Sequence, residues 1–186
     1  MNRQQLAHIL RAASRVVGDP DVLVLGSQSI LGSYDEDELP PASTMSMEAD
    51  IAFLDDPDRG KADLVEGAIG ELSTFHSENG YYAEGVDVST AILPIGWRDR
   101  VTTWSVSSSA PATPWFLEKH DLAVAKLMAG RPKDLEFVGS LLDLTKLSLR
   151  LLGERLADME PSAHSVAIER ARRWVDGRAS RGPMTT

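Results

Sequence analysis

The spacing of apolar residues changes along the chain, and this change limits the fold more than any other feature of the sequence. Short apolar runs bounded by glycine, proline and aspartate alternate with helical patterns in the first 112 residues. From Pro114 onward every apolar pattern has the helical period. The sequence therefore predicts an α/β (α+β) fold, in which a mixed sheet with flanking helices is followed by a C-terminal helical bundle.

The chain has the length and composition of one ordinary globular domain. It has 186 residues, of which 42% are hydrophobic and 25% are charged. We expect an α/β core over residues 1–112, a helical region packed on that core over residues 113–178, and a flexible tail over residues 179–186. The sequence contains no cysteine, which excludes disulfides and thiolate metal sites.

Apolar periodicity and turn residues place the individual elements. The expected helices cover residues 3–17, 30–32, 61–72, 121–129, 132–142, 145–159 and 162–176. The expected strands cover residues 21–25, 47–54, 85–91 and 100–106, and an acidic, proline-bearing surface loop covers residues 34–45. In the helix over residues 61–72, Leu64, Ala68 and Leu72 share one face.

Two carboxylates lie in the second expected strand, where burial makes a charge costly. Glu48 and Asp50 are two residues apart, so in a strand their side chains project side by side from the same face. Two like charges at that separation raise each other's pKa unless a cation lies between them. Adjacent carboxylates are typical ligands of Mg²⁺, although a strand end whose carboxylates face solvent explains the pair equally well.

A Gly-Ser turn precedes this acidic pair. Gly26-Ser27-Gln28-Ser29 follows the first expected strand and leads into a brief helix. A small turn at a helix start exposes backbone N–H groups and a hydroxyl, which suits a phosphate, although an ordinary turn has the same composition. The segment lacks the patterns of a Walker loop, a GxSxG nucleophile elbow and a GxGxxG dinucleotide fingerprint. The four histidines are scattered without metal-ligand spacing, which argues against a zinc site.

Charge is distributed unevenly between the two halves of the chain. Residues 1–90 contain 5 Lys and Arg against 17 Asp and Glu, whereas residues 91–186 contain 14 against 11. The net charge of −9 argues against a generic nucleic-acid binder, but a basic half beside an acidic site suits a polyanionic substrate. The first 17 residues are too polar for a signal peptide and no apolar run has membrane-spanning length, so we expect a cytoplasmic protein.

The segment VLGSQSILG followed by SMEADIAF resembles the signature of the DNA polymerase β-like nucleotidyltransferases. In that superfamily a strand ending in Gly-Ser is followed, after a short helix, by an acidic-x-acidic pair preceded by Ser or Thr. Gly26-Ser27 and residues 46–51 match these two elements. The segments GYYAEGVDVSTAILPIGWRDRV and LEKHDLAVAKLMAGRPKDLEFV resemble uncharacterised bacterial nucleotidyltransferase-like proteins related to the AbiEii and MenT toxins. The resemblance covers about residues 20–143 and implies a nucleotidyltransferase-like fold.

The resemblance implies roles for the residues of the two motifs. Gly26 and Ser27 would bind the triphosphate of an NTP. Glu48 and Asp50 would bind Mg²⁺ or Mn²⁺. Glu48 stands where the family usually has Asp, which lengthens the reach to the metal by one methylene and changes or weakens its binding.

Three residues outside the motifs complete the site that the resemblance implies. Asp87, an acid between two valines, is the candidate for the superfamily's third metal-binding carboxylate, although an acid at a strand end is as often structural. Lys126 would neutralise the phosphates, the alternative being a lysine that extends from a half-buried helix face. Asp134 matches an acid that completes the site in the toxin-like families, although with Arg131 and Lys133 it also fits a charge cluster at a helix start.

Together these inferences predict a Mg²⁺-dependent nucleotidyltransferase. It would move a nucleoside monophosphate from an NTP to an RNA, such as a tRNA 3′ end, or to a protein hydroxyl. By resemblance it would act as the toxin of a toxin–antitoxin system, with a cognate antitoxin protein as partner and no membrane partner. Two alternatives stay open: a non-catalytic nucleotide-binding module in which Glu48 has lost efficient metal binding, and an interaction domain whose C-terminal helices dock a partner helix.

Overall fold

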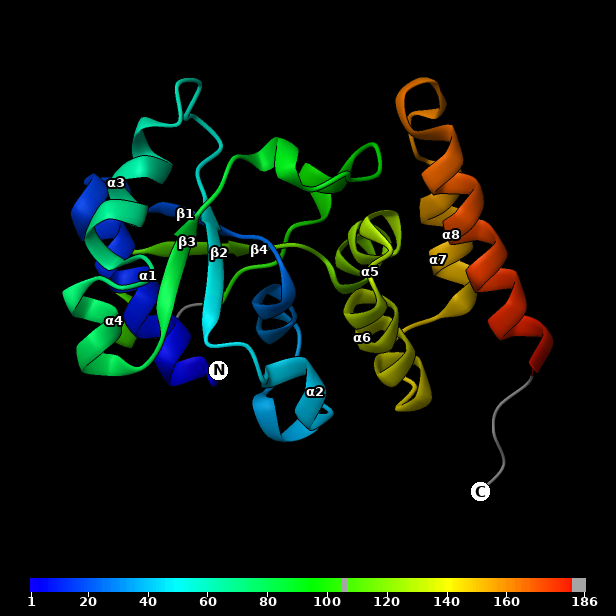
Figure 1. Ribbon diagram of the computed structural model, residues 1–186, viewed down its shortest axis with the longest axis horizontal. Helices are drawn as coiled ribbons and strands as arrows, with labels where there is room; N and C mark the ends of the chain where they lie inside the picture. Colours follow the sequence, from blue (N-terminus) through cyan, green and yellow to red (C-terminus); the bar gives the residue numbers. More distant parts are fainter. Residues whose placement is uncertain (105–106, 182–186) are drawn as a thin grey trace.

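The computed structural model describes residues 1–104 and 107–181 (Figure 1). Within this part of the chain, four strands form one mixed sheet in the order β3-β2-β1-β4. The strands are β1 (Asp21–Val24), β2 (Glu48–Ala52), β3 (Tyr82–Gly85) and β4 (Thr113–Phe116). β1 pairs antiparallel with β2 and parallel with β4, and β2 pairs parallel with β3. The expected mixed sheet is confirmed.

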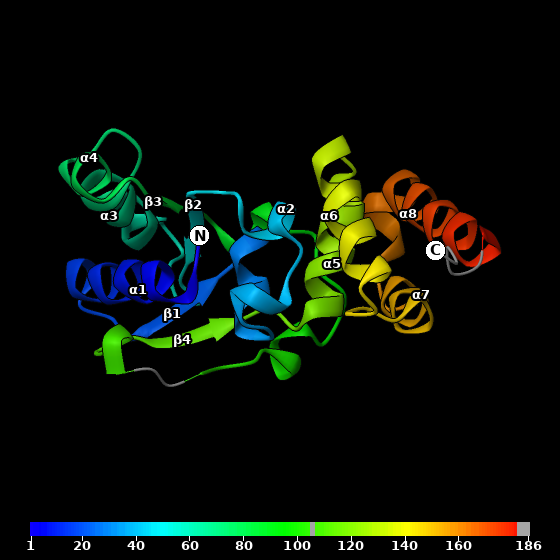
Figure 2. The same ribbon diagram turned by 90° about the horizontal axis from the view of Figure 1, so that it is seen from below.

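Helices flank the sheet on two sides (Figures 1 and 2). One group consists of α1 (Arg3–Val17), α3 (Gly60–Ile69) and α4 (Thr74–Asn79). The opposite group consists of α5 (Lys119–Ala129), α6 (Pro132–Asp143), α7 (Leu149–Ala157) and α8 (Pro161–Arg181), and it confirms the expected C-terminal bundle. The connections contain α2 (Pro41–Thr44) and the 3₁₀ helices η1 (Ser27–Gly32), η2 (Glu36–Glu38), η3 (Val88–Thr90), η4 (Trp97–Arg100) and η5 (Ser107–Ser109).

α1 covers the residues predicted for it because both of its ends are capped. The Asn2 side chain accepts a hydrogen bond from Gln5 N, and the Gln5 side chain accepts one from Asn2 N. These bonds satisfy N–H groups that have no partner within the first turn of a helix. At the other end Gly18 has a φ of 74°, a conformation that favours glycine. On the apolar face of the helix, Leu6, Ile9, Leu10 and Ala13 are fully buried, whereas Val16 near its end is 36% exposed.

β4 contradicts the expectation that only helices follow Pro114. Residues 113–116 pair in parallel with β1, and Phe116 is fully buried with its ring stacked on Trp104 at 5.0 Å between centroids. The strand has four residues, one of them proline, so it is too short to display a two-residue period. The sheet therefore includes residues from the segment that was expected to be purely helical.

The predicted strands over residues 85–91 and 100–106 are wrong within the described residues. β3 ends at Gly85, and η3 follows it because the Asp87 side chain accepts a hydrogen bond from Ser89 N at 2.6 Å. In the second segment Thr102 forms an isolated bridge with Phe116, and residues 105–106 lie outside the described residues. Both segments carry apolar residues that pack on the core from a loop, which explains their strand-like composition.

α3 buries a different face from the one predicted. Ala62 and Ile69 are buried, whereas Leu64 is 54% exposed and Leu72, beyond the end of the helix, is 90% exposed. The approach of α3 to β3 selects the buried face. A Cβ on Gly85 would lie 1.9 Å from the Ala62 carbonyl oxygen, so glycine permits this close contact.

Two further expectations concern irregular segments. Residues 34–45 form a connection, as predicted, although it contains η2 and α2. Residues 179–181 are the end of α8 and do not belong to a flexible tail, and residues 182–186 lie outside the described residues. No helix in residues 1–104 and 107–181 is long and apolar enough to cross a membrane.

A buried ion-pair cluster fixes the start of α5, the helix that contains Lys126. The Asp121 carboxylate is fully buried and accepts two hydrogen bonds from Arg100, at 2.8 and 3.0 Å. Arg155 on α7 lies 3.1 Å from the same carboxylate. Burial raises the pKa of Asp121, and the bonds from Arg100 oppose that shift. The cluster ties α5 to η4 and α7, so it sets the orientation of the helix that carries Lys126.

Candidate active site

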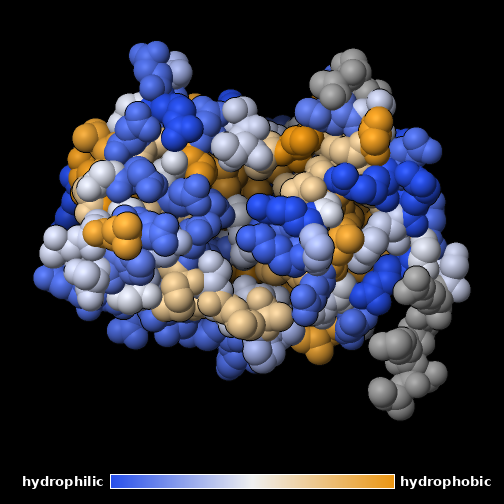
Figure 3. Space-filling view, viewed as in Figure 1, coloured by the Kyte–Doolittle hydropathy of each residue, from blue (hydrophilic) through white to orange (hydrophobic). Residues whose placement is uncertain are grey.

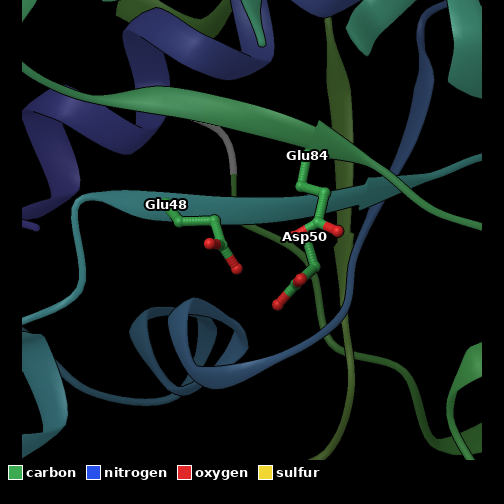
Figure 4. A group of neighbouring side chains, drawn as sticks. All are labelled: Glu48, Asp50 and Glu84. Atoms are coloured by element: carbon green, nitrogen blue, oxygen red, sulfur yellow. The ribbon is translucent and has the colours of Figure 1, made fainter. Parts of the chain in front are cut away.

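Three carboxylates converge on one face of the sheet (Figure 4). Glu48 and Asp50 project from the same face of β2, as expected for residues two apart. Glu84 projects from β3, where it lies beside Asp50 in the parallel register. One oxygen from each carboxylate lies within 4.8 Å of the others. Glu48 and Asp50 are half-buried and Glu84 is exposed, so the group opens to solvent at one edge.

Asp87, which was expected to supply the third carboxylate, does not join this group. It follows β3, and its carboxylate caps η3 by accepting the hydrogen bond from Ser89 N, which lowers the pKa of Asp87. Glu84 takes the third position because β2 and β3 pair in a register that places it beside Asp50. The sequence signal for Glu84 is weak: it is an acid inside a four-residue strand whose pairing partner the sequence does not reveal.

Burial and mutual repulsion perturb the pKa values of this group. Burial, and then repulsion from Glu48, raises the pKa of Asp50, while the charge of Lys126 opposes the shift. Partial desolvation of the otherwise exposed Glu84 carboxyl, and then the charge of Glu48, raise the pKa of Glu84 to about 7. Three carboxylates this close are costly to ionise together unless a cation neutralises them. All three supply hard oxygen ligands, so the donor set fits Mg²⁺ or Mn²⁺.

The Gly-Ser turn packs directly against Asp50. Leu25 N donates a hydrogen bond of 2.9 Å to the Asp50 carbonyl oxygen, which holds the turn beside β2. Gly26 has a φ of 56°, and a Cβ at this position would lie 1.5 Å from Asp50 Oδ2. Both facts restrict position 26 to glycine. Ser27 begins η1 and lines the same cavity as the carboxylates, so the structure brings the two predicted motifs together.

Lys126 and Asp134 lie on the opposite wall of this cavity. Lys126 is only 9% exposed, and its Nζ lies 3.5 Å from Asp134 Oδ1. Burial lowers the pKa of Lys126, while Asp134 and Asp50 oppose that shift. Burial alone would raise the pKa of Asp134, but the hydrogen bond from Arg131 Nε at 2.6 Å and the charge of Lys126 lower it overall. The Asp134 carboxylate is therefore paired with two cations and lies apart from the three grouped carboxylates.

The carboxylates, the turn and Lys126 line one cavity of about 730 Å³. Its sheet side is acidic. Its helix side carries three cations, Lys126, Arg131 and Lys133, against two carboxylates, Asp134 and Glu136, so it has a small excess of positive charge. Figure 3 shows hydrophilic side chains gathered over the middle of this face, where the sheet meets α5 and α6. A cavity of this volume accommodates a small organic ligand such as a nucleotide.

A family model described as a nucleotidyltransferase of unknown function (DUF6036) matches residues 4–178. The chain belongs to this nucleotidyltransferase family. The match spans the sheet and the helical half, so it includes every residue of the candidate site. No curated protein and no solved structure matched the chain. The relation to the AbiEii and MenT toxins stays a prediction.

Gly26→Ala should damage the candidate site while the sheet stays folded. The new Cβ collides with the Asp50 carboxylate and adds backbone strain of about 1–3 kcal/mol, so the melting temperature should fall and any metal-induced rise should disappear. Gly80→Ala is the matched control, because Gly80 has a φ of 74° but a Cβ there meets nothing within 4 Å. Equal metal responses in the two variants, measured by thermal unfolding with and without Mg²⁺, would contradict the contact between Gly26 and Asp50.

The raised pKa of Glu84 makes the stability of the metal-free protein depend on pH in a defined way. The folded state binds the Glu84 proton up to about pH 7, whereas an unfolded glutamate releases it near pH 4.5. The stability contributed by that proton is complete below pH 4.5 and is lost as the pH rises to about 7. In EDTA, the melting temperature of wild type should therefore fall relative to Glu84→Gln between pH 5 and 8. Parallel curves for the two proteins would show that Glu84 has an ordinary pKa.

Proposed function

We propose that the chain is a nucleotidyltransferase that depends on Mg²⁺ or Mn²⁺ and transfers a nucleoside monophosphate from an NTP. The observation that carries the proposal is the arrangement of opposite charges across one cavity. Three carboxylates lie within 4.8 Å of one another on the sheet, and Lys126 lies on the facing helix. A triphosphate with its divalent ion is the ligand whose charges complement both walls.

Each wall of the cavity has its own task in this proposal. Glu48, Asp50 and Glu84 would hold the divalent ion, which would supply charge neutralisation at the phosphates. The Ser27 hydroxyl would donate to a phosphate oxygen, and glycine at position 26 lets the turn that carries Ser27 lie directly against Asp50. Lys126 neutralises the charge that develops as the acceptor oxygen bonds to the α-phosphorus and pyrophosphate leaves.

The buried ion pair between Lys126 and Asp134 supports this role for the lysine. A lysine that is only 9% exposed pays a large desolvation cost, which Asp134 offsets. Arg131 also bonds to Asp134, so the carboxylate keeps a partner when Lys126 moves toward a phosphate. We therefore assign Asp134 to positioning Lys126 at the edge of the phosphate site.

We further propose that the acceptor is an RNA hydroxyl. Arg131 and Lys133 are exposed where α6 begins at the rim of the cavity, and the C-terminal half of the chain is the basic one. Such a rim attracts the phosphates that flank an RNA 3′ end. A protein hydroxyl is the other acceptor that the resemblance implies. A toxin role and a cognate antitoxin belong to the same proposal, and loss of growth on expression of the chain would support them.

Incubation with each of the four α-³²P-labelled NTPs, Mg²⁺ and a mixture of total RNA and soluble proteins tests this function. We expect one labelled RNA size class with one preferred nucleotide, and no label with EDTA. A labelled protein band would support the proposed transfer activity but show that the acceptor is a protein and not an RNA. NTP binding in calorimetry without transfer to either acceptor would favour a non-catalytic nucleotide-binding module, in which Glu48 weakens the use of the metal.

A further inference from the structure

Tyr82 makes a side-chain contact to the metal-binding group that neither motif predicts. It is the first residue of β3 and lies beside Glu48 in the parallel register between β2 and β3. Its hydroxyl donates a hydrogen bond of 3.1 Å to Glu48 Oε2. The tyrosine at the neighbouring position, Tyr81, points to the opposite face of the strand, where its hydroxyl bonds to His8 Nδ1 at 2.8 Å.

The Tyr82 ring is itself held in place. His76 packs on it with 4.6 Å between ring centroids and an interplanar angle of 45°. The His76 ring is fixed in turn, because its Nδ1 accepts a hydrogen bond of 3.1 Å from Leu72 N. The phenol is therefore braced by α4 and its preceding turn, and it presents its hydroxyl to Glu48 from a fixed direction.

Glu48 has a particular need for such a partner. A glutamate has one more rotatable bond than an aspartate, so holding its carboxylate at a metal ion costs more conformational entropy. Asp50 is fixed without help of this kind, because the Gly26 backbone lies directly against its carboxylate. A hydrogen bond to one oxygen of Glu48 restricts the remaining rotation and leaves the other oxygen available to a cation.

We propose that Tyr82 is a positioning residue whose hydroxyl fixes the Glu48 carboxylate for the divalent ion. The proposal rests on the metal-dependent function proposed above. It explains how this chain uses a longer acid in the first metal-binding position: Tyr82 compensates for the additional methylene by restricting the end of the side chain. Tyr82 acts through Glu48 and does not itself touch the ion.

The test is the affinity for Mn²⁺, measured on the full chain by electron paramagnetic resonance, which needs no acceptor or turnover. Tyr82→Phe removes the hydroxyl and keeps the ring packed on His76, so Mn²⁺ affinity should fall roughly tenfold, the usual effect of losing a partner that orients a metal ligand. Tyr81→Phe is the matched control. It also removes a tyrosine hydroxyl that is hydrogen-bonded, but on the opposite face of β3, so its Mn²⁺ affinity should equal that of wild type.

A double-mutant cycle separates positioning from general support of the fold. Glu48→Asp withdraws the carboxylate by one methylene and breaks its contact with Tyr82, so adding Tyr82→Phe to Glu48→Asp should cause no further loss of Mn²⁺ affinity. The inference would be overturned if the losses of Mn²⁺ affinity were additive, or if Tyr82→Phe bound Mn²⁺ as tightly as wild type. Either result leaves the proposed function standing as long as the wild-type protein binds Mn²⁺. Wild type that binds no Mn²⁺ would overturn the proposed function together with this inference.

Discussion

Asp50→Asn should abolish nucleotide transfer and the response of the protein to divalent ions. The carboxamide cannot supply the anionic oxygen that the ion needs, and losing a metal that contributes several kcal/mol to the transition state lowers the rate by about a thousandfold. The metal-free protein should keep or slightly increase its melting temperature, because burial and repulsion from Glu48 raise the pKa of Asp50 and the neutral side chain avoids both costs.

The measurement combines a transfer assay with thermal unfolding in EDTA and in Mg²⁺. Asp55→Asn serves as the control. Asp55 is exposed just beyond β2, so this substitution removes the same charge at a position outside the cavity. Asp55→Asn should retain transfer and the metal-induced rise in melting temperature. A metal response of wild-type size in Asp50→Asn would place the ion elsewhere and contradict the assignment of this carboxylate.

Lys126→Met should abolish transfer while the fold stays intact. Methionine keeps an unbranched chain against Phe137, whose ring lies 5.7 Å from Lys126 Nζ, but it removes the positive charge. Losing one preorganised charge at the reacting phosphates lowers the rate by about a hundred- to a thousandfold. Asp134 should stay satisfied in the variant, because Arg131 still donates to it at 2.6 Å, so far-ultraviolet circular dichroism should match wild type.

Lys119→Met on the same helix is the matched control for this substitution. Lys119 also lies over an aromatic ring, with its Nζ 4.9 Å from the Tyr34 centroid, but it does not line the cavity. Its variant should transfer nucleotide at nearly the wild-type rate. Transfer retained in Lys126→Met would show that the lysine only packs on α6, and would remove the strongest argument for a phosphate site on α5.

The parts of the fold that could be predicted are those governed by local chemistry. α1 begins and ends at its predicted residues because Asn2 and Gly18 are capping residues that the sequence displays. The Gly-Ser turn and the pair of acids on β2 were likewise visible, since a strand has a fixed two-residue period.

The parts that could not be predicted depend on how distant segments pair. Glu84 joins the site only because β3 pairs with β2 in the register that places Glu84 beside Asp50. Asp87 has a more strand-like neighbourhood, but its side chain caps η3 instead. The clash that excludes any side chain at Gly26 is likewise invisible in the sequence, because it arises from Asp50, on another strand.

The same limit applies to β4 and α3. β4 is four residues long, so pairing with β1, and not propensity, makes it a strand. Leu64 and Leu72 have suitable helical spacing, yet they are exposed because the contact of Ala62 with Gly85 sets the rotation of α3. Sequence spacing gives the period of an element, whereas packing decides which face is buried.

A crystal structure of the chain with Mn²⁺ and a non-hydrolysable NTP would test the account most directly, because Mn²⁺ is located by its anomalous scattering. We predict an anomalous peak about 2 Å from oxygens of Glu48, Asp50 and Glu84, with the triphosphate between Gly26-Ser27 and Lys126. A triphosphate bound elsewhere, or a Mn²⁺ peak that touches none of the three carboxylates, would contradict it.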